Sequence, residues 1–387
     1  MNAHRVCSPP RPRCAALVWL VFLLLAGMAR AAPVPPVQTV FVIVLENNNW
    51  ASFKGSASAP FLNSVLLPAA SRCEQYYNPP GLHPSEPNYL WLEAATNFGI
   101  LNNNNPALNH LATTNHLTSL LTRAGISWKS YQEDIDGTYI PLTATNLYAP
   151  KHNPMVFFDD VTGTNNLQDP FGLAHIRPYF ELATDLANNT VPRYCFITPN
   201  LANDGHDAVA PTFNTVRQTD DWLAREVPRI TNSAAFRNNG ALFITWDEGL
   251  GSDGPIGMLV LSPLARGGGY FNNRHYTHSS FVRTMQDIFG VNQTYLHDAA
   301  NAADLFDLFA PFSVAGTNNP ATGGFELLVG GVIPGRTNVV QAATQPGSWT
   351  GFATNVLSVN ALSNQFRAAD PGTAGAVGRF YRVLQLP

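Results

Sequence analysis

The architecture follows from one apolar stretch near the start of the chain, TVFVIVLE at residues 39–46. Its first seven residues are apolar or β-branched without interruption, a pattern typical of a strand that is buried on both faces. Two later stretches repeat it, PRYCFITPN (192–200) and GALFITWDEG (240–249). Because strands of this kind need cover on both sides, the three stretches favour a parallel sheet between layers of helices.

The segments between these strands support the same architecture. Helical spacing of apolar residues predicts helices at 59–71, 107–123, 175–189, 212–235 and 278–290, and further strands are expected at 73–79, 126–133 and 257–265. Strands that alternate with helices indicate an α/β fold with a mostly parallel sheet and helices on both faces.

The pattern of apolar and polar residues changes near residue 311. No long helical pattern follows, and short apolar runs such as FELLVGGV and RFYRVLQLP are separated by Gly, Pro and Asn. This pattern predicts a small all-β C-terminal domain over 324–387, joined by a linker at 313–323 to the larger α/β domain over 32–312.

The N-terminus has the pattern of a targeting segment. Three arginines precede an apolar run of 14 residues (15–28), which is followed by Ala29-Arg30-Ala31. This combination predicts a secretory signal peptide over 1–31, and the alternative is an N-terminal membrane anchor. With no second apolar stretch of spanning length, we expect a mature protein without a transmembrane segment, secreted or periplasmic.

Composition narrows the possible partners. The chain has 387 residues, of which 45% are hydrophobic and 12% charged, with three lysines and a net charge of -4. We therefore expect no nucleic-acid binding, which needs a basic footprint. Export would leave two cysteines, Cys73 and Cys195, as either a disulfide or two buried thiols on strands.

Two pairs of polar residues directly follow apolar strands. Glu46-Asn47 ends the first strand, and Asp247-Glu248 ends the strand at 240–246. Ligand sites in parallel sheets lie at the carboxyl ends of the strands, and oxygen donors gathered there suit a hard cation. A single pair would indicate a helix cap or a turn, but two pairs placed alike predict a metal site.

A serine between two prolines is the candidate nucleophile. Ser85 lies in LHPSEPNYL (82–90), where Pro84 and Pro87 hold the backbone of a rigid turn. A bound metal would activate such a hydroxyl, although a serine between prolines is otherwise only a turn residue. The segment is not a G-x-S-x-G elbow, so it does not support an ordinary Ser-His-Asp hydrolase.

Several histidines lie at the predicted ends of elements. They are His83, His152, His206 and His278, with Lys151 beside the second of them. Donors that converge on one place suit an oxyanion of high charge such as phosphate. The absence of a Walker A loop, a G-x-G-x-x-G and an H-E-x-x-H argues against nucleotide-loop and zincin sites.

Together these motifs resemble a known family. In order, LENNNW, LHPSEPNYL, GISWKSYQED, KHNP, FITPNLANDGHD and FITWDEG are similar to segments of the phosphoesterase family of secreted acid phosphatases and phospholipases C. The resemblance covers about residues 38–290 and is closest to the short acid-phosphatase branch. It implies an alkaline-phosphatase-like fold and a metal-assisted hydroxyl nucleophile.

The resemblance also implies roles for individual residues. It makes Ser85 the nucleophile and assigns His206 to the phosphate or to the proton of the leaving group. By the same resemblance, the metal ligands are Glu46, Asn47, Asp247 and Glu248, and phosphate contacts come from His83, Asn47, Lys151, His152 and His278. One or more divalent ions are implied, with Mg, Ca and Mn favoured by the oxygen donors and Zn by relatives of this fold.

The sequence therefore predicts a secreted metal-dependent phosphoric ester hydrolase. We expect an acid phosphatase that acts on small phosphomonoesters through a phosphoseryl intermediate, since ENNNW and Tyr89 stand where the phospholipase C branch has arginines. A phosphodiesterase or phospholipase C is the alternative enzyme, whereas a sulfatase lacks support because no C-x-P-x-R occurs. The alternative of another class is a non-catalytic surface-binding protein, with the C-terminal domain binding a surface or polymer.

Overall fold

A computed structural model describes residues 34–251, 253–309, 313–318, 325–330, 337–345, 348–356, 365–370 and 379–386. The predicted signal peptide at 1–31 lies outside the described residues. No helix in the described part of the chain is both long enough and apolar enough to cross a membrane.

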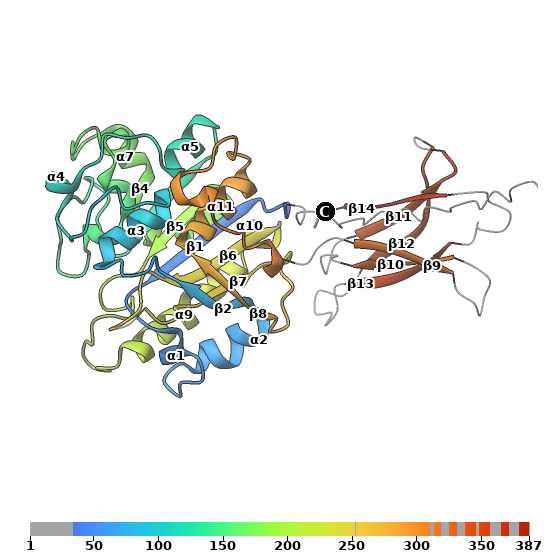
Figure 1. Ribbon diagram of the computed structural model, residues 1–387, viewed down its shortest axis with the longest axis horizontal. Coiled ribbons are helices and arrows are strands. Elements are labelled where there is room, and N and C mark those ends of the chain that lie inside the picture. Colours follow the sequence, from blue (N-terminus) through green and yellow to red (C-terminus); the bar gives the residue numbers. More distant parts are fainter. Residues whose placement is uncertain are drawn as a thin grey trace, which may run out of the picture. The chain divides into compact units, whose positions relative to one another are not determined.

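A sheet forms the centre of the α/β body, as predicted, and it has eight strands (Figure 1). Its strands are β1 (Thr39–Leu45), β2 (Ser71–Tyr77), β3 (Trp128–Gln132), β4 (Ile176–Pro178), β5 (Tyr194–Thr198), β6 (Gly240–Trp246), β7 (Met258–Leu261) and β8 (Phe271–Thr277). They lie in the order β4-β3-β5-β1-β6-β7-β2-β8. Only β7 runs antiparallel to its neighbours, so the sheet is mostly parallel.

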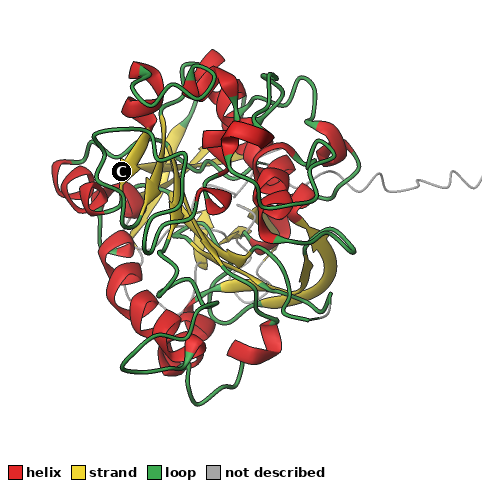
Figure 2. Ribbon diagram, turned by 90° about the vertical axis from the view of Figure 1, so that its left-hand side faces the viewer, coloured by secondary structure: helices red, strands yellow, loops and turns green. Residues whose placement is uncertain are grey.

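Helices cover both sides of this sheet (Figure 2). They are α1 (Trp50–Phe53), a π-helical turn (Leu62–Leu66), α2 (Leu67–Ala69), α3 (Ser85–Ala94), α4 (Pro106–Asn109), α5 (Leu117–Arg123), α6 (Asp159–Thr162), α7 (Pro170–His175), α8 (Phe180–Asn188), α9 (Thr215–Thr231), α10 (Ala234–Arg237) and α11 (His278–Phe289). Short 3-10 turns lie at Pro150–His152, Pro154–Phe157, His297–Ala300 and Phe306–Leu308. Every residue of β1, β5 and β6 is buried, which confirms strands covered on both faces.

Three elements differ from the sequence prediction. The helix expected at 107–123 is two helices, because the buried Glu93 carboxylate accepts the backbone N–H and the hydroxyl of Thr118 and so starts α5 anew. The helix expected at 175–189 begins only at Phe180, after the short strand β4 pairs with β3. Strand β8 was not predicted, since most of its residues are polar and exposed at the sheet edge.

The C-terminal region forms two three-stranded antiparallel sheets, which confirms an all-β region. Its strands are β9 (Ser313–Asn318), β10 (Phe325–Gly330), β11 (Thr337–Ala343), β12 (Thr350–Val356), β13 (Gln365–Asp370) and β14 (Phe380–Leu386). A small core of Leu327, Val329, Val340, Phe366 and Ala368 joins the two sheets. The predicted linker at 313–323 is corrected here, because β9 lies within it and pairs with β10.

The two described cysteines are free thiols. Cys73 lies in β2 and Cys195 in β5, and three strands separate these two in the sheet. At roughly 4.8 Å between neighbouring strands, this separation is several times the span of a disulfide. The alternative of two buried thiols is therefore the correct one.

Candidate active site

Three acidic residues meet at the carboxyl edge of the sheet. Glu46 directly follows β1, Asp247 directly follows β6, and Asp204 lies in the loop after β5. Their strands are neighbours, in the order β5-β1-β6, and run parallel, so the chain leaves all three at the same edge. The backbone joins the segments, since Glu46 N–H donates to the Asp204 carbonyl and Asp247 N–H donates to the Leu45 carbonyl.

These three carboxyls are fully buried and incompletely bonded. Each has an oxygen that accepts no hydrogen bond from the described residues, namely Glu46 Oε1, Asp204 Oδ2 and Asp247 Oδ2. Burial, followed by the negative charge of Glu46, raises the pKa of both Asp204 and Asp247 well above its usual range. Buried carboxyl oxygens without hydrogen bonds require a proton, a cation or a basic neighbour to offset the loss of solvation.

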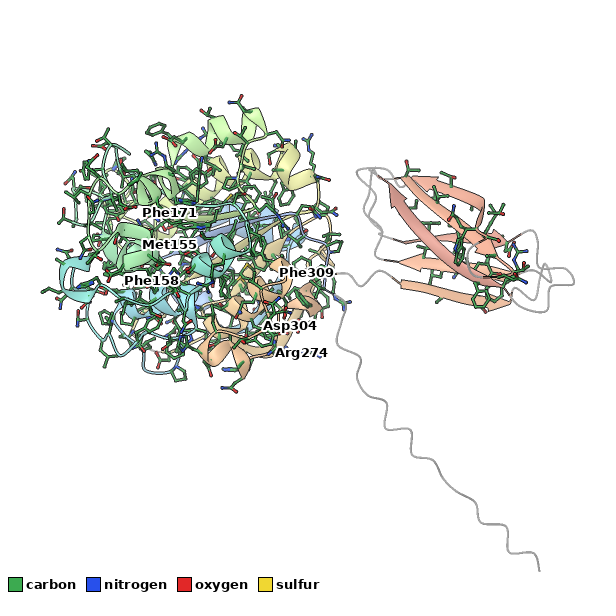
Figure 3. The ribbon with its side chains drawn as sticks, turned by 90° about the horizontal axis from the view of Figure 1, so that it is seen from above. Met155, Phe158, Phe171, Arg274, Asp304 and Phe309 are labelled. Atoms are coloured by element: carbon green, nitrogen blue, oxygen red, sulfur yellow. The ribbon has the colours of Figure 1, made fainter. Side chains whose placement is uncertain are left out.

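Two basic residues face Glu46 from the 3-10 turn at 150–152. His152 Nε2 lies 3.1 Å from Glu46 Oε1, and the His152 ring stacks on Tyr89 with 5.2 Å between ring centroids. Burial alone would raise the pKa of Glu46, but His152 and Lys151 outweigh it and lower that pKa to about 2. Met155 and Phe158, labelled in Figure 3, are buried in the core and anchor the segment that follows this turn.

Ser85 is the first residue of helix α3, not a turn residue. Its hydroxyl donates to Glu46 Oε2 over 3.0 Å and lies 3.4 Å from Asn47 Oδ1. Lys151 Nζ lies 3.5 Å from the same Oγ. The predicted nucleophile thus lies between a carboxylate and an ammonium group, where a phosphoryl group would be both attacked and held.

Glu248 is also buried, and both of its carboxylate oxygens have hydrogen-bond partners. Its Oε1 accepts from Asn47 Nδ2 over 2.7 Å, and its Oε2 accepts from Asn88 Nδ2 over 2.9 Å and contacts His83 Nδ1. Both oxygens accept hydrogen bonds, and the metal-ligand role of Glu248 stays a prediction. The bond from Asn47 Nδ2 also fixes the Asn47 amide so that its oxygen faces Ser85.

A cavity of about 410 Å³ opens beside these residues. It is lined by Asn47, His83, Gly249, Leu250, Gly251 and Asp253. His83 Nε2 bonds Asp253 Oδ1 over 2.9 Å, and Asp253 Oδ2 accepts the backbone N–H of Gly81 over 2.8 Å. His83 thus borders both the cavity and the acid edge.

The other two predicted histidines lie in different environments. The His206 side chain is 43% exposed, its Nδ1 is 2.8 Å from Asp207 Oδ1, and its backbone N–H donates to Asp204. His278 is fully buried at the start of α11, with Nε2 2.6 Å from the Asp247 carbonyl and Nδ1 3.1 Å from the Tyr76 hydroxyl. Burial lowers the pKa of His278 to about 4, so it is a neutral support for Asp247, and the predicted phosphate contact does not fit this placement.

Asp204 is the residue that sequence reasoning missed. It stands in a Gly- and Asn-rich loop, where an acid is an ordinary turn residue. The available signal was its position shortly after a buried parallel strand, the same signal that identified Glu46 and Asp247.

The donor atoms fit a hard cation. No three His, Cys, Asp or Glu side chains within the described residues form a ready metal-binding group. Glu46, Asp204 and Asp247 nevertheless each have a buried oxygen without a hydrogen bond, and Glu46 lies beside Ser85 Oγ, which is 3.4 Å from Asn47 Oδ1. Such a set of oxygen donors matches the preference of Mg²⁺, Mn²⁺ or Ca²⁺, and His152 Nε2 adds one nitrogen.

The chain belongs to the phosphoesterase family, whose model matches residues 67–292. It is 31% identical over 292 residues to a phosphatidylinositol-3-phosphatase of Mycobacterium tuberculosis, covering 75% of this chain and 89% of that relative. It is 29% identical over 220 residues to a phosphate-repressible acid phosphatase of Penicillium chrysogenum, covering 54% of this chain and 50% of that relative. The chain thus spans about half the length of this fungal relative.

A solved structure gives a further comparison. A protein of the alkaline phosphatase superfamily from Vibrio parahaemolyticus superposes with a TM-score of 0.46 and 11% identity, over 84% of this chain and 85% of that one. Family membership and the named relatives make this protein a phosphoric ester hydrolase.

Proposed function

We propose that the protein is a secreted, metal-dependent acid phosphatase that cleaves phosphomonoesters through a phosphoseryl intermediate. The observation that carries the proposal is the Ser85 hydroxyl at 3.0 Å from Glu46, at the edge of three buried carboxyls. A hydroxyl held between a carboxylate and Lys151 suits attack on a phosphoryl group.

Glu46, Asn47, Asp204 and Asp247 are the residues that would hold a divalent cation. When bound, the cation would lower the pKa of the Ser85 hydroxyl and neutralise charge on the phosphoryl oxygens. Two further residues orient this set: Glu248 accepts a hydrogen bond from the Asn47 amide, and His278 Nε2 contacts the Asp247 carbonyl. Mg, Ca, Mn and Zn all remain in the proposal.

The chain's own residues account for the remaining steps. Ser85 Oγ forms the new bond to phosphorus, and its proton is already directed at Glu46 Oε2. Lys151, His152 and His83 supply positive charge or donors to the phosphoryl oxygens. The bond from phosphorus to the ester oxygen breaks, the leaving alkoxide takes a proton for which His206 is the candidate donor, and water then hydrolyses the phosphoserine.

The cavity beside Asn47 and His83 would receive the alcohol part of the substrate. No arginine or lysine stands among its lining residues, and Asp253 adds a carboxylate. A neutral alcohol with hydroxyl groups suits this lining better than a second anionic group does. The similarity to a phosphatidylinositol-3-phosphatase supports a second candidate, a phosphomonoester on a lipid headgroup, for which Leu250 would be the apolar contact.

The test is hydrolysis of a phosphomonoester and a phosphodiester side by side by protein lacking residues 1–31, with and without chelator. Chelator-sensitive cleavage of the monoester, restored by added metal, is the expected result. Preference for the diester would replace the proposal with a phosphodiesterase or phospholipase C. If neither were cleaved with any of the four metals, the non-catalytic surface-binding alternative would stand. Secretion is tested separately, by locating the full chain in the medium, periplasm or membrane of expressing cells.

A further inference from the structure

An asparagine run, Asn102 to Asn105, is the least expected feature of the catalytic region. It lies on the surface between α3 and α4, with all four residues exposed, and none of the site residues above comes from it. The Asn103 side chain nevertheless reaches helix α3, which carries Ser85 at its first position, and the Asn102 side chain accepts a hydrogen bond from Asn109 at the end of α4.

Helix α3 has no local cap. The residue before it is Pro84, which has no side-chain acceptor for the first N–H groups of the helix, and Pro87 removes another donor from the first turn. The missing acceptor comes from the run, because Asn103 Oδ1 accepts the Glu86 backbone N–H over 3.0 Å. That N–H belongs to the residue directly after Ser85, so this bond fixes the turn of backbone that carries the nucleophile.

A second link holds the Glu86 side chain, which is buried. Asn109 Nδ2 donates to Glu86 Oε1 over 2.7 Å and to Asn102 Oδ1 over 2.8 Å. The buried Asn109 amide therefore ties the asparagine run to the residue after Ser85. Asn88, further along the same helix, donates to the Pro84 carbonyl and to Glu248.

We infer that Asn103 is a positioning residue for Ser85, with Asn109 as its buried support. This inference rests on the proposed role of Ser85 as nucleophile. Losing the cap frees the first turn of α3 to shift, and a shift there moves Oγ relative to Glu46 and Lys151. Misplacement of a reacting atom slows the chemical step more than it weakens substrate binding.

The experiment compares three variants of protein lacking residues 1–31, with a phosphomonoester as substrate. Asn103→Ala removes the acceptor, and Asn103→Asp keeps an acceptor oxygen in the same place. Asn105→Ala is the matched control, because Asn105 belongs to the same exposed run and its side chain makes no capping bond. Each variant is measured for kcat, KM, melting temperature and hydrogen exchange at the Glu86 amide.

Asn103→Ala is expected to lower kcat about tenfold, with KM within about twofold of the parent protein. Asn103→Asp should recover most of kcat, because it keeps the acceptor oxygen. An effect of its added charge should appear in KM and become smaller as the salt concentration rises. Faster exchange at the Glu86 amide in Asn103→Ala, but not in Asn105→Ala, would show the lost cap directly.

Two results would overturn the inference. One is an unchanged kcat in Asn103→Ala despite faster exchange, which would make the cap catalytically irrelevant. The other is an equal loss of kcat in Asn103→Ala and Asn103→Asp, which would show that the loss does not come from the missing acceptor oxygen. These results differ from a failure of the proposed function. In that case the parent protein itself would not cleave the phosphomonoester, whatever the rate of hydrogen exchange at the Glu86 amide.

Discussion

The Ser85 hydroxyl donates to Glu46 Oε2 across 3.0 Å, joining the first residue of helix α3 to the residue that follows strand β1. The bond directs the hydroxyl proton at the carboxylate and turns the oxygen lone pairs elsewhere. Lys151 Nζ approaches the same oxygen at 3.5 Å. Two charged groups on separate segments thus define the direction from which an ester can reach Ser85.

Ser85→Ala should abolish phosphomonoester hydrolysis and leave the fold intact. Loss of a nucleophile lowers kcat by at least about a thousandfold, and the missing oxygen contacts only the site. Steady-state kinetics and thermal melting measure the two effects. Ser52→Ala, at an exposed serine outside the site, is the control, and comparable activity in the two variants would refute a covalent mechanism.

Asp204→Asn should reduce metal stoichiometry and activity together. The side chain is fully buried beside Glu46, and an amide offers the cation a neutral and therefore weaker ligand. Metal analysis after dialysis gives the stoichiometry. Asp221→Asn on the exposed face of α9 serves as control, and full metal content in Asp204→Asn would remove Asp204 from the ligand set.

Glu248→Gln should weaken metal binding without abolishing it. Three donors converge on the two Glu248 oxygens, so an amide nitrogen there faces another donor and disturbs the orientation of Asn47. Substitution of a residue that orients a ligand costs about 10- to 100-fold in metal affinity or activity. Titration with metal separates this result from Asp247→Asn, for which we expect loss of binding. Equal losses in the two variants would make Glu248 a direct ligand.

Glu86 should make the protein less stable as the pH rises. Burial raises the pKa of Glu86 from its ordinary value of 4.5 to about 8, against smaller lowering effects of Asn109 and Lys151. The folded state therefore holds a proton that the unfolded chain releases. The stabilisation is complete below pH about 4.5 and is lost as the pH passes about 8. Chemical denaturation across this pH range gives the free energy of unfolding, which should fall less steeply with pH in Glu86→Gln than in the parent protein. The same fall in both proteins would contradict the raised pKa of Glu86.

Leu250→Lys should widen the range of substrates. It places a cation on the rim of a cavity whose lining has no lysine or arginine. The ratio of kcat/KM for a substrate with an anionic leaving group to that for a neutral one should rise severalfold and fall again with salt. Leu250→Gln is the uncharged control. An unchanged ratio would mean that the leaving group lies elsewhere.

Much of the α/β body could be predicted because its central strands are buried on both faces. Strands β1, β5 and β6 are continuous apolar runs, which are buried only when helices cover both faces of the sheet. The polar residues that follow these strands lie at the same edge of the sheet. Strand β8 could not be predicted in this way, since an edge strand with exposed Asn, Arg and His side chains has no apolar pattern.

The sequence predicts which residues make up the candidate site. It does not predict which of these side chains are buried or which of their oxygens accept hydrogen bonds. Glu46 and Glu248 look alike in sequence, each beside another polar residue after a strand. Only the fold shows that Asn47, Asn88 and His83 contact both oxygens of Glu248. Glu46 Oε1, by contrast, accepts no hydrogen bond from the described residues, although His152 Nε2 lies 3.1 Å away. Likewise His278 was correctly placed at the start of a helix, but its complete burial depends on Tyr76 and on the loop after β6.

The two strand thiols have a practical consequence. Because Cys73 and Cys195 are buried and have three strands between them, the described fold needs no oxidant to form. Burial raises the pKa of both thiols well above its usual range, which keeps them in the unreactive protonated form. A recombinant chain that lacks the predicted signal peptide, residues 1–31, can therefore be produced in a reducing cytoplasm and handled with thiol reagents in the buffer.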